Sequence, residues 1–553
     1  MATHLNVTLV FLILIQNVKL NQNLPEVTIS QGTLRGIIGK TIQGRSILEF
    51  RGIPYAEPPI GEKRFKASVP LKSWHGVLDA TKDHNPCPQD DEMFRLLRIH
   101  GNEDCLFLNV YTPKISNDEL LPVIAFIHGG GFMSNNANPS LFGPNILLDK
   151  DVILVTINYR LGALGFLSTE DDVVPGNNGL KDQSLALHWI KNNIKSFGGN
   201  PSKITIFGQS AGGANLIFAG ISSSGITPAG WSLAPKGSGI RNAKRLANYL
   251  SCPTTSNTEM VKCLKKVSAK DIIIQSNRFL EFNYDPGIPF KPTIEHSHQD
   301  AFITQHPLEI IKQGKMANVP FMTGVTSDDG AMKSAAIYND SSLVERLNNN
   351  FNKYLPMVLN YDHLYINQST DKYTNTIKKF YLNDKGFDNS AKSALTDMVT
   401  DALFFYPARS VSVLHAKHSK KPVYFYLFEY RGSTSTSTYF GDRQHDYGVA
   451  HSDDIIYLLS SDIVIFNPNE EDKKMIELMT TLWYNFATTG NPTSNVDDIK
   501  SKHWQPVTTD NLEYYSIKNY DKVSMKKNLF EKRFQFWKNL NVFNEAEKIK
   551  IEL

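Results

Sequence analysis

The chain has 553 residues, of which 41% are hydrophobic and 20% are charged, and its formal net charge is +3. This composition is typical of a folded globular protein. Because the net charge is small and no basic stripe is present, nucleic-acid binding is disfavoured. No stretch has the composition of a linker, so one large domain over residues 23–553 is favoured over two domains.

The N-terminal segment Val7–Ile15 reads VTLVFLILI. It has the length of a signal-peptide core and is shorter than the roughly 20 apolar residues that span a bilayer. We therefore expect a signal peptide over residues 1–22, with a first core strand as the alternative. No later segment is apolar enough for a transmembrane anchor. The chain ends in Lys550-Ile551-Glu552-Leu553, one residue from a Lys-Asp-Glu-Leu retrieval signal. Secretion and residence in the endoplasmic reticulum lumen both stay open.

Strand and helix patterns alternate along the rest of the chain. Five apolar runs predict buried strands of a parallel sheet covered on both faces, namely Pro122–Ile127, Val152–Asn158, Lys203–Phe207, Val319–Val325 and Val423–Phe428. Helical periodicity is present in Leu180–Phe197, Lys473–Phe486 and Lys526–Phe543. This alternation predicts an open α/β sheet flanked by helices. The site of such a sheet forms at the carboxyl ends of its strands.

The first of these strands, Pro122–Ile127, leads into His128 and three glycines. Glycines leave backbone N–H groups bare, so a run of them after this strand is typical of the oxyanion-hole loop of esterases. A phosphate-binding loop is the alternative. It would require a Gly-Lys-Ser/Thr ending, which is absent.

The strand Lys203–Phe207 leads into Gly208-Gln209-Ser210-Ala211-Gly212. A Gly-x-Ser-x-Gly pattern after a buried strand predicts a nucleophile elbow, which exposes the Ser210 hydroxyl on a tight, strained turn. A glycine-rich turn without chemistry is the alternative.

A serine nucleophile needs a general base, and the base needs an orienting carboxylate. In α/β-hydrolases the acid and then the histidine follow the serine along the chain. The strand Val319–Val325 is followed by Asp328 and Asp329, and His451 lies on a loop beyond Val423–Phe428. His445 is a second candidate base. Spacing alone does not separate the two aspartates.

The four cysteines form two close pairs in the sequence. An even number of cysteines in a chain with a signal peptide favours two local disulfides, and four free thiols are the alternative. No Cys-x-x-Cys spacing is present, so a metal site is disfavoured. Asn339 and Asn367 each begin an Asn-x-Ser glycosylation acceptor.

Several longer motifs carry a family resemblance. They are Phe50-Arg51-Gly52-Ile53-Pro54-Tyr55-Ala56, Glu103-Asp104-Cys105-Leu106-Phe107-Leu108-Asn109-Val110, Asn158-Tyr159-Arg160-Leu161-Gly162 and Asp182-Gln183. With the elbow and the glycine loop, they make the chain resemble the type B carboxylesterases, which include cholinesterases and insect esterases. The resemblance runs from about Glu26 to the C-terminal helix and implies an α/β-hydrolase fold.

The resemblance also implies roles for single residues. It makes Ser210, Asp329 and His451 a catalytic triad, with Asp where the family more often has Glu. It implies an oxyanion hole of Gly130, Gly131 and Ala211, a substrate pocket with Trp231 and Phe290, disulfides Cys87–Cys105 and Cys252–Cys263, and ion pairs Arg64–Glu103 and Arg160–Asp182. No metal or cofactor is implied.

Three departures from the family pattern bear on the function. The loop between Cys87 and Cys105 contains no Trp, which argues against a choline ester, because cholinesterases hold the cation on a Trp in this loop. Gln209 stands where Glu is usual, as in juvenile hormone esterases, so that substrate stays open. The segment after Ser210 is shorter than the family's, which predicts the loss of most of the helix that begins beneath the nucleophile.

The sequence therefore predicts a serine esterase that hydrolyses carboxylic esters, either xenobiotic or lipid-like, with a small-molecule ester as its partner. A neuroligin-like adhesion protein is the alternative from another functional class, and a slow sequestering esterase is a second alternative.

Overall fold

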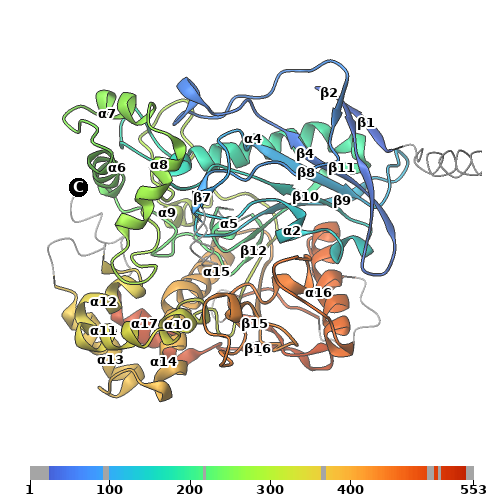
Figure 1. Cartoon of the computed structure of the whole chain (residues 1–553). Helices are drawn as coiled ribbons and strands as arrows, with labels where there is room; N and C mark the ends of the chain where they lie inside the picture. Colours follow the sequence, from blue (N-terminus) through green and yellow to red (C-terminus); the bar gives the residue numbers. More distant parts are fainter. Residues whose placement is uncertain are drawn as a thin grey trace, which may run out of the picture.

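The computed structural model describes residues 24–90, 99–215, 219–362, 369–494, 503–508 and 512–542. An eleven-stranded sheet runs through the centre of the molecule in the order β16-β15-β14-β13-β12-β11-β9-β10-β8-β4-β3 (Figure 1). Neighbouring strands from β10 to β15 pair in parallel, and the outer strands pair antiparallel. The strands of this sheet are β3 (Ile37–Lys40), β4 (Ser46–Pro54), β8 (Phe107–Thr112), β9 (Leu121–Ile127), β10 (Ile153–Ile157), β11 (Gly199–Gln209), β12 (Gly220–Ser223), β13 (Phe321–Thr326), β14 (Val423–Phe428), β15 (Glu513–Ile517) and β16 (Val523–Lys527).

Alternate residues of the central strands enter two separate hydrophobic cores. In β9, Val123 and Ala125 join the core that includes Trp189 of α4 (Asn178–Asn193). Ile124 and Phe126 join the core that includes Trp483 of α16 (Glu470–Thr489). The two helices therefore cover opposite faces of the sheet, which explains why β9 is apolar at every position.

All five predicted strands are present, each within a few residues of its expected bounds. The helix predicted over Leu180–Phe197 is also present, as α4 followed by the 3₁₀ turn η4 (Ile194–Phe197). The helix predicted over Lys526–Phe543 is wrong at its start, because Lys526 and Lys527 end the edge strand β16. The helix α17 begins only at Glu531 and ends at Leu540, and Phe543 lies outside the described residues.

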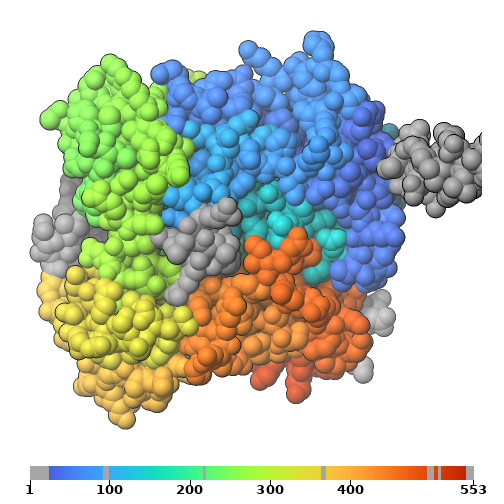
Figure 2. All heavy atoms as spheres, in the orientation of Figure 1, coloured from blue at the N-terminus to red at the C-terminus, as the bar shows by residue number. Residues whose placement is uncertain are grey.

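Many of the remaining helices belong to two segments of the chain. Figure 2 shows the segment with α6 to α8, in green, and the segment with α10 to α14, in yellow and orange, on one side of the molecule, and the blue N-terminal strands on the other. Besides α4, α16 and α17, the described helices include α2 (Pro139–Phe142), α3 (Gly162–Phe166), α6 (Ser238–Tyr249), α7 (Asn257–Leu264), α8 (Ala269–Ile274), α9 (Pro307–Lys312), α10 (Ala331–Tyr338), α11 (Ser341–Asn349), α12 (Phe351–Val358), α13 (Asp371–Leu382), α14 (Lys392–Val399), the π-helix η8 (Thr400–Phe405) and α15 (Tyr406–His418).

Two disulfides, Cys87–Cys105 and Cys252–Cys263, have the predicted pairing. The ion pairs are also those predicted. Arg64 donates to both carboxylate oxygens of Glu103, and Arg160 donates to both of Asp182, with Nε to Oδ2 at 2.7 Å and Nη2 to Oδ1 at 2.6 Å.

Two small sheets complete the N-terminal part, β1 (Glu26–Ile29) with β2 (Gly32–Arg35) and β5 (Val77–Asp79), and β6 (Gln89–Asp90) with β7 (Ile99–His100).

Some predictions stay open. The signal peptide, Asn367 and the last four residues lie outside the described residues. Asn339 is exposed at the end of α10, so its glycosylation stays a prediction. Among the helices that the structure describes, none has the length and apolarity to cross a membrane.

Candidate active site

Ser210 lies at the turn between β11 and α5 (Ala211–Ala214), at the carboxyl end of a central strand. Its backbone has φ 54° and ψ −122°, a strained conformation for a residue other than glycine. The Ser210 N–H donates to the Ser223 carbonyl at 2.8 Å, which ties the turn to β12. The side chain is 9% exposed. These features are those of a nucleophile elbow.

The helix after the elbow is a single turn of four residues, as the short sequence predicts. The chain then returns at once to the sheet, where β12 pairs in parallel with β11. The loop after β12 consequently packs directly on the elbow. A Cβ atom built on Gly225 would lie 1.9 Å from the backbone oxygen of Ser210. Only glycine fits at this position without moving Ser210.

His451 and Asp329 lie beside the elbow and are joined to each other. His451 Nδ1 lies 2.8 Å from Asp329 Oδ1, and the two residues are 3% and 0% exposed. The other oxygen of Asp329 accepts from the Thr326 N–H at 3.0 Å and from the Ser224 hydroxyl at 3.1 Å. The carboxylate is therefore held from both sides, with one oxygen left for the imidazole.

The competing candidates have other partners. Asp328 accepts from the Val449 N–H at 3.0 Å and from its neighbour Ser327. The side chain of His445 is 53% exposed and lies 2.8 Å from Asp442. The geometry thus favours Asp329 over Asp328, which spacing left undecided, and it favours His451 over His445.

Gln209 contacts the other nitrogen of the imidazole. Its Nε2 lies 3.1 Å from His451 Nε2 and donates to the Ser452 hydroxyl at 2.7 Å. Among the hydrogen bonds of the described residues, none joins the Ser210 hydroxyl to His451. Gln209 thus occupies the position at which a serine hydroxyl would hydrogen-bond to His451. Catalytic hydrogen bonds often tighten only once substrate is bound.

Two further aspartates, which the sequence reasoning did not single out, hold the histidine loop. Asp453 accepts from the N–H groups of Thr436 at 2.7 Å and Ala450 at 2.8 Å. Asp454 accepts from Tyr426 Oη at 2.8 Å. Burial raises the pKa of Asp453 to about 6 and raises the pKa of Asp454 above its ordinary value. Their position directly after His451 and Ser452 was the only sequence signal for them.

The glycine loop after β9 lies opposite the elbow. Gly130 has φ 103°, and a Cβ atom on it would lie 2.3 Å from the Ser134 backbone oxygen, so a side chain does not fit there. In the described part of the chain, the N–H groups of Gly130, Gly131 and Ala211 donate to no protein acceptor. Ala211 is the first residue of α5, whose N–H has no acceptor within the helix. Three free donors thus lie around Ser210.

The described residues form two cavities that both include Ser210 in their walls. The first, which we name the histidine-side cavity, has a volume of about 170 Å³ and also contains His451. It is lined largely by hydrocarbon side chains, among them Ile42, Leu141, Phe142, Ile456, Leu459, Val464 and Phe466. The second, the tryptophan-side cavity, has a volume of about 110 Å³ and contains Trp231 but not His451. Both volumes are comparable to a cavity that holds a benzene ring.

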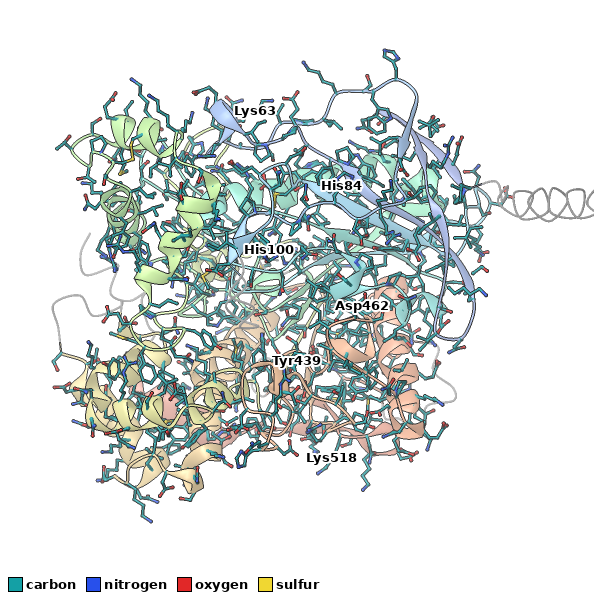
Figure 3. The ribbon with its side chains drawn as sticks, viewed as in Figure 1. Lys63, His84, His100, Tyr439, Asp462 and Lys518 are labelled. Carbon is teal, nitrogen blue, oxygen red and sulfur yellow. A yellow bond between two sulfur atoms is a disulfide. The ribbon has the colours of Figure 1, made fainter. Side chains whose placement is uncertain are left out.

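The wall of the histidine-side cavity is fixed by backbone hydrogen bonds. Gly143 and Ser460 exchange both of their N–H to carbonyl bonds, at 2.7 and 3.1 Å, and the Asp462 N–H donates to the Ser140 carbonyl at 2.8 Å. Tyr439, labelled with Asp462 in Figure 3, donates to the Ile463 carbonyl at 2.6 Å. The segment 460–463 is therefore attached at several points to the chain that follows the glycine loop.

The two predicted pocket residues differ in position. Trp231 lines the tryptophan-side cavity, where its Nε1 donates to the Leu403 carbonyl at 2.8 Å. Phe290 is not among the described residues that line either cavity. Its ring packs instead on Phe279, at 5.4 Å between centroids, and Ile288 occupies the wall in its place.

Phe404 of the π-helix η8 was missed by the sequence reasoning. Its ring lies 4.7 Å from that of His451 and 6.1 Å from that of Trp231. The described residues contain no group of three or more His, Cys, Asp or Glu side chains arranged to hold a metal ion.

Comparisons with known proteins identify one family. The model of the carboxylesterase family matches residues 23–537. "Venom carboxylesterase-6" of Apis mellifera is 35% identical over 95% of the chain and 96% of its own length. "Esterase FE4" of Myzus persicae is 37% identical over 88% and 87%. "Juvenile hormone esterase" of Tribolium castaneum is 34% identical over 85% and 84%.

Proposed function

The chain belongs to the carboxylesterase family, whose α/β-hydrolase fold it has, and on that premise we propose that Ser210, His451 and Asp329 hydrolyse carboxylic esters by two-step acyl transfer. The observation that carries the proposal is the 2.8 Å contact between His451 and Asp329 beside a strained serine at a strand end. The relatives' names support the reaction class, since they include carboxylesterases and a carboxylic ester hydrolase.

In the first step, the Ser210 hydroxyl attacks the ester carbonyl while His451 Nε2 takes its proton. His451 then gives this proton to the leaving alcohol, and an acyl-enzyme remains. Water attacks the acyl group by the same route and releases the acid. Asp329 keeps the Nδ1 proton of His451 in place and stabilises the charged imidazolium that forms.

The tetrahedral intermediate of each step carries a negative oxygen. The free N–H groups of Gly130, Gly131 and Ala211 are the donors for this oxygen in our proposal. Loss of one such donor typically costs about 2.7–4 kcal/mol of transition-state stabilisation.

Apolar walls support lipid-like esters as the substrate class. Among the described residues that line the histidine-side cavity, none is Asp, Glu, Lys or Arg, so a hydrocarbon alcohol fits it better than a cationic one. A juvenile hormone ester is one member of this class. The relative named juvenile hormone esterase and the presence of Gln209 keep it as a specific candidate.

The test is hydrolysis of p-nitrophenyl acetate and butyrate by the purified chain, with Ser210→Ala as the comparison. We expect parent activity to exceed that of the variant by at least about 10³-fold, because the nucleophile is removed. An organophosphate should label the parent and leave the variant unlabelled. Equal hydrolysis by both proteins would overturn the proposal.

The contact between Gln209 and His451 favours a second candidate, a slow sequestering esterase. The amide contacts the imidazole nitrogen that must activate water in the second step, so the acyl-enzyme would persist if an ester displaces the amide only during acylation. Pre-steady-state kinetics separate the two candidates. A stoichiometric burst of p-nitrophenol followed by very slow turnover would support sequestration, and a steady rate without a burst would exclude it.

A further inference from the structure

Among the described residues that line the tryptophan-side cavity, one carries a charged side chain, Lys333, in an otherwise largely apolar wall. Trp231, Ile288, Met332, Leu403 and Phe404 supply hydrocarbon surface. Lys333 lines the same cavity although it is only 7% exposed. It lies on α10, one helical turn after Asp329, so the helix that follows the triad acid also carries this lysine.

Lys333 has two partners inside the protein. Its Nζ donates to Asp285 Oδ1 at 2.6 Å and to the Val358 carbonyl at the end of α12 at 2.7 Å. The side chain of Asp285 is 2% exposed. A lysine ammonium has three N–H donors, so two are engaged by these partners and one is left for a group in the cavity.

Fold stability alone gives a weak reason for this pair. Replacing a buried ion pair by apolar residues of similar volume is often neutral or stabilising, because both charges must leave water. Burial raises the pKa of Asp285 even though Lys333 acts to lower it, which shows that desolvation outweighs the attraction. Unlike the buried pair Lys181–Glu295, this pair has one member, Lys333, in the wall of a cavity next to Ser210, and that position favours recognition.

The two cavities correspond to the two halves of an ester. The leaving alcohol receives its proton from His451, and only the histidine-side cavity has that residue in its wall. The acyl half, which stays on Ser210, therefore extends into the tryptophan-side cavity. Lys333 then faces the acyl group throughout acylation and deacylation.

We propose that Lys333 recognises an uncharged hydrogen-bond acceptor, a carbonyl or ether oxygen, on the acyl part of the substrate. This inference rests on the proposed function and names the substrate class more closely. Asp285 already balances the charge of Lys333, so a neutral oxygen gains a hydrogen bond without the repulsion that a carboxylate would meet from Asp285. The remaining acyl chain contacts the apolar wall.

The first test is a series of p-nitrophenyl esters of linear acids with four to eight carbons. Each acid is used with a ketone oxygen at its penultimate carbon and as the matching hydrocarbon. We expect the ketone to be preferred by roughly tenfold or more in kcat/KM at one chain length, since a hydrogen bond to a charged group is worth that factor. Deacylation rates should show the same preference, because the alcohol has left by then. Equal rates at every chain length would overturn the proposal.

The second test is the paired variant Lys333→Met with Asp285→Leu. Removing only Lys333 would leave a buried carboxyl unpaired, so both charges are replaced together. Within this variant, the ketone-to-hydrocarbon ratio should fall to about one, and this ratio is independent of any general loss of activity. A ratio that survives in the variant would assign the preference to another residue and contradict the role of Lys333.

The matched control is Lys181→Met with Glu295→Leu. Lys181 and Glu295 form a buried lysine–carboxylate pair at 2.7 Å, and neither lines the two cavities. The control loses an ion pair of the same kind and should keep the ketone preference. Failure of the parent to hydrolyse any ester, with Ser210 unlabelled by organophosphate, would instead contradict the proposed function and the inference with it.

Discussion

At the scale of single residues, the orientation of Asp329 is fixed because both oxygens of its carboxylate have hydrogen-bond partners. One oxygen contacts His451, and the other accepts from Ser224 and from the Thr326 N–H. Asp is shorter than Glu by one methylene. Asp329 follows shortly after the end of β13, and its carboxylate contacts the imidazole of His451 directly. The Asp328–Ala450 bridge joins these two loops through their backbones.

Replacing Asp329 with Asn tests this arrangement. The amide keeps the shape but does not stabilise the charged imidazolium, so we expect kcat for p-nitrophenyl butyrate to fall by roughly 10⁴-fold. Asp328→Asn is the control, since that side chain contacts Val449 and Ser327 rather than the imidazole. A smaller loss for Asp329→Asn than for Asp328→Asn would contradict the assignment.

The sequence predicts those residues that sit in local motifs and misses those that long-range packing brings together. Ser210 and the glycine loop follow strands directly, so their positions can be inferred from a few neighbouring residues. Phe404 reaches His451 from a π-helix, and Asp453 binds Thr436 across a loop. Neither contact leaves a local pattern. Phe290, which the resemblance implied as a pocket residue, packs on Phe279 and is not among the described residues that line either cavity.

At the scale of elements, the single-turn helix α5 makes the elbow depend on β12 and its loop. The Ala214 N–H donates to the Ser210 carbonyl at 2.9 Å, and the Ser210 N–H is held by Ser223. Gly225 packs against that same carbonyl. The strained serine is thus restrained by neighbouring strands more than by a long helix.

The variant Gly225→Ala should disrupt the elbow. The added Cβ would meet fixed backbone at 1.9 Å, so either the loop or Ser210 must move. We expect the free energy of unfolding to fall by about 1–3 kcal/mol, in line with overpacking elsewhere, and esterase activity to fall with it. Gly76→Ala is the control, because its Cβ would meet nothing within 4 Å, although its φ of +81° also strains alanine. Equal melting temperatures and activities for the two variants would contradict this account of the elbow.

The boundary between β16 and α17 shows why the start of the helix predicted over Lys526–Phe543 was wrong. Lys526 and Lys527 fit a helical period with the aromatics that follow, yet pairing with β15 places them in an edge strand. Lys526 and Lys527 pair with Tyr514 and Glu513 of the preceding strand, and helical periodicity within the segment does not detect this pairing. The continuous apolar strands of the central sheet carry a stronger signal and were found.

At the scale of the whole molecule, buried histidines make the fold sensitive to acid. His128 and His415 are 1% and 0% exposed, and burial lowers the pKa of each to about 4. An unfolded histidine titrates near 6.5. The neutral form is therefore favoured in the folded chain, and this contribution to stability is present above pH 6.5 and is lost as the pH falls toward 4.

The variant His415→Phe should reduce this acid sensitivity. Its ring stacks on Phe321, and phenylalanine preserves that contact without titrating. Between pH 6.5 and 4, the free energy of unfolding should fall by about 3 kcal/mol less in the variant than in the parent. Urea unfolding at several pH values measures the difference. Replacement of the exposed His75 by Gln is the control and should follow the parent curve.

Asp401 has the opposite effect on the pH dependence of the free energy of unfolding over the same pH range, so it serves as an internal comparison. Burial raises its pKa to about 7, so the folded chain retains a proton that the unfolded chain releases above about pH 4. Its contribution to stability falls as the pH rises through this interval. An Asp401→Asn variant should therefore change the pH slope with the sign opposite to His415→Phe.

The meeting of two cavities at Ser210 has a consequence for inhibitor selectivity. A trifluoromethyl ketone with one substituent for each cavity would form its reversible adduct with the serine and place both arms at once. Once the first arm is bound, the second experiences a high effective concentration, so the combined affinity can exceed that of either arm alone by orders of magnitude. Because the wall at segment 460–463 is already fastened by backbone hydrogen bonds, little ordering is required on binding. Two-armed compounds should thus discriminate this esterase from relatives in which either cavity is filled.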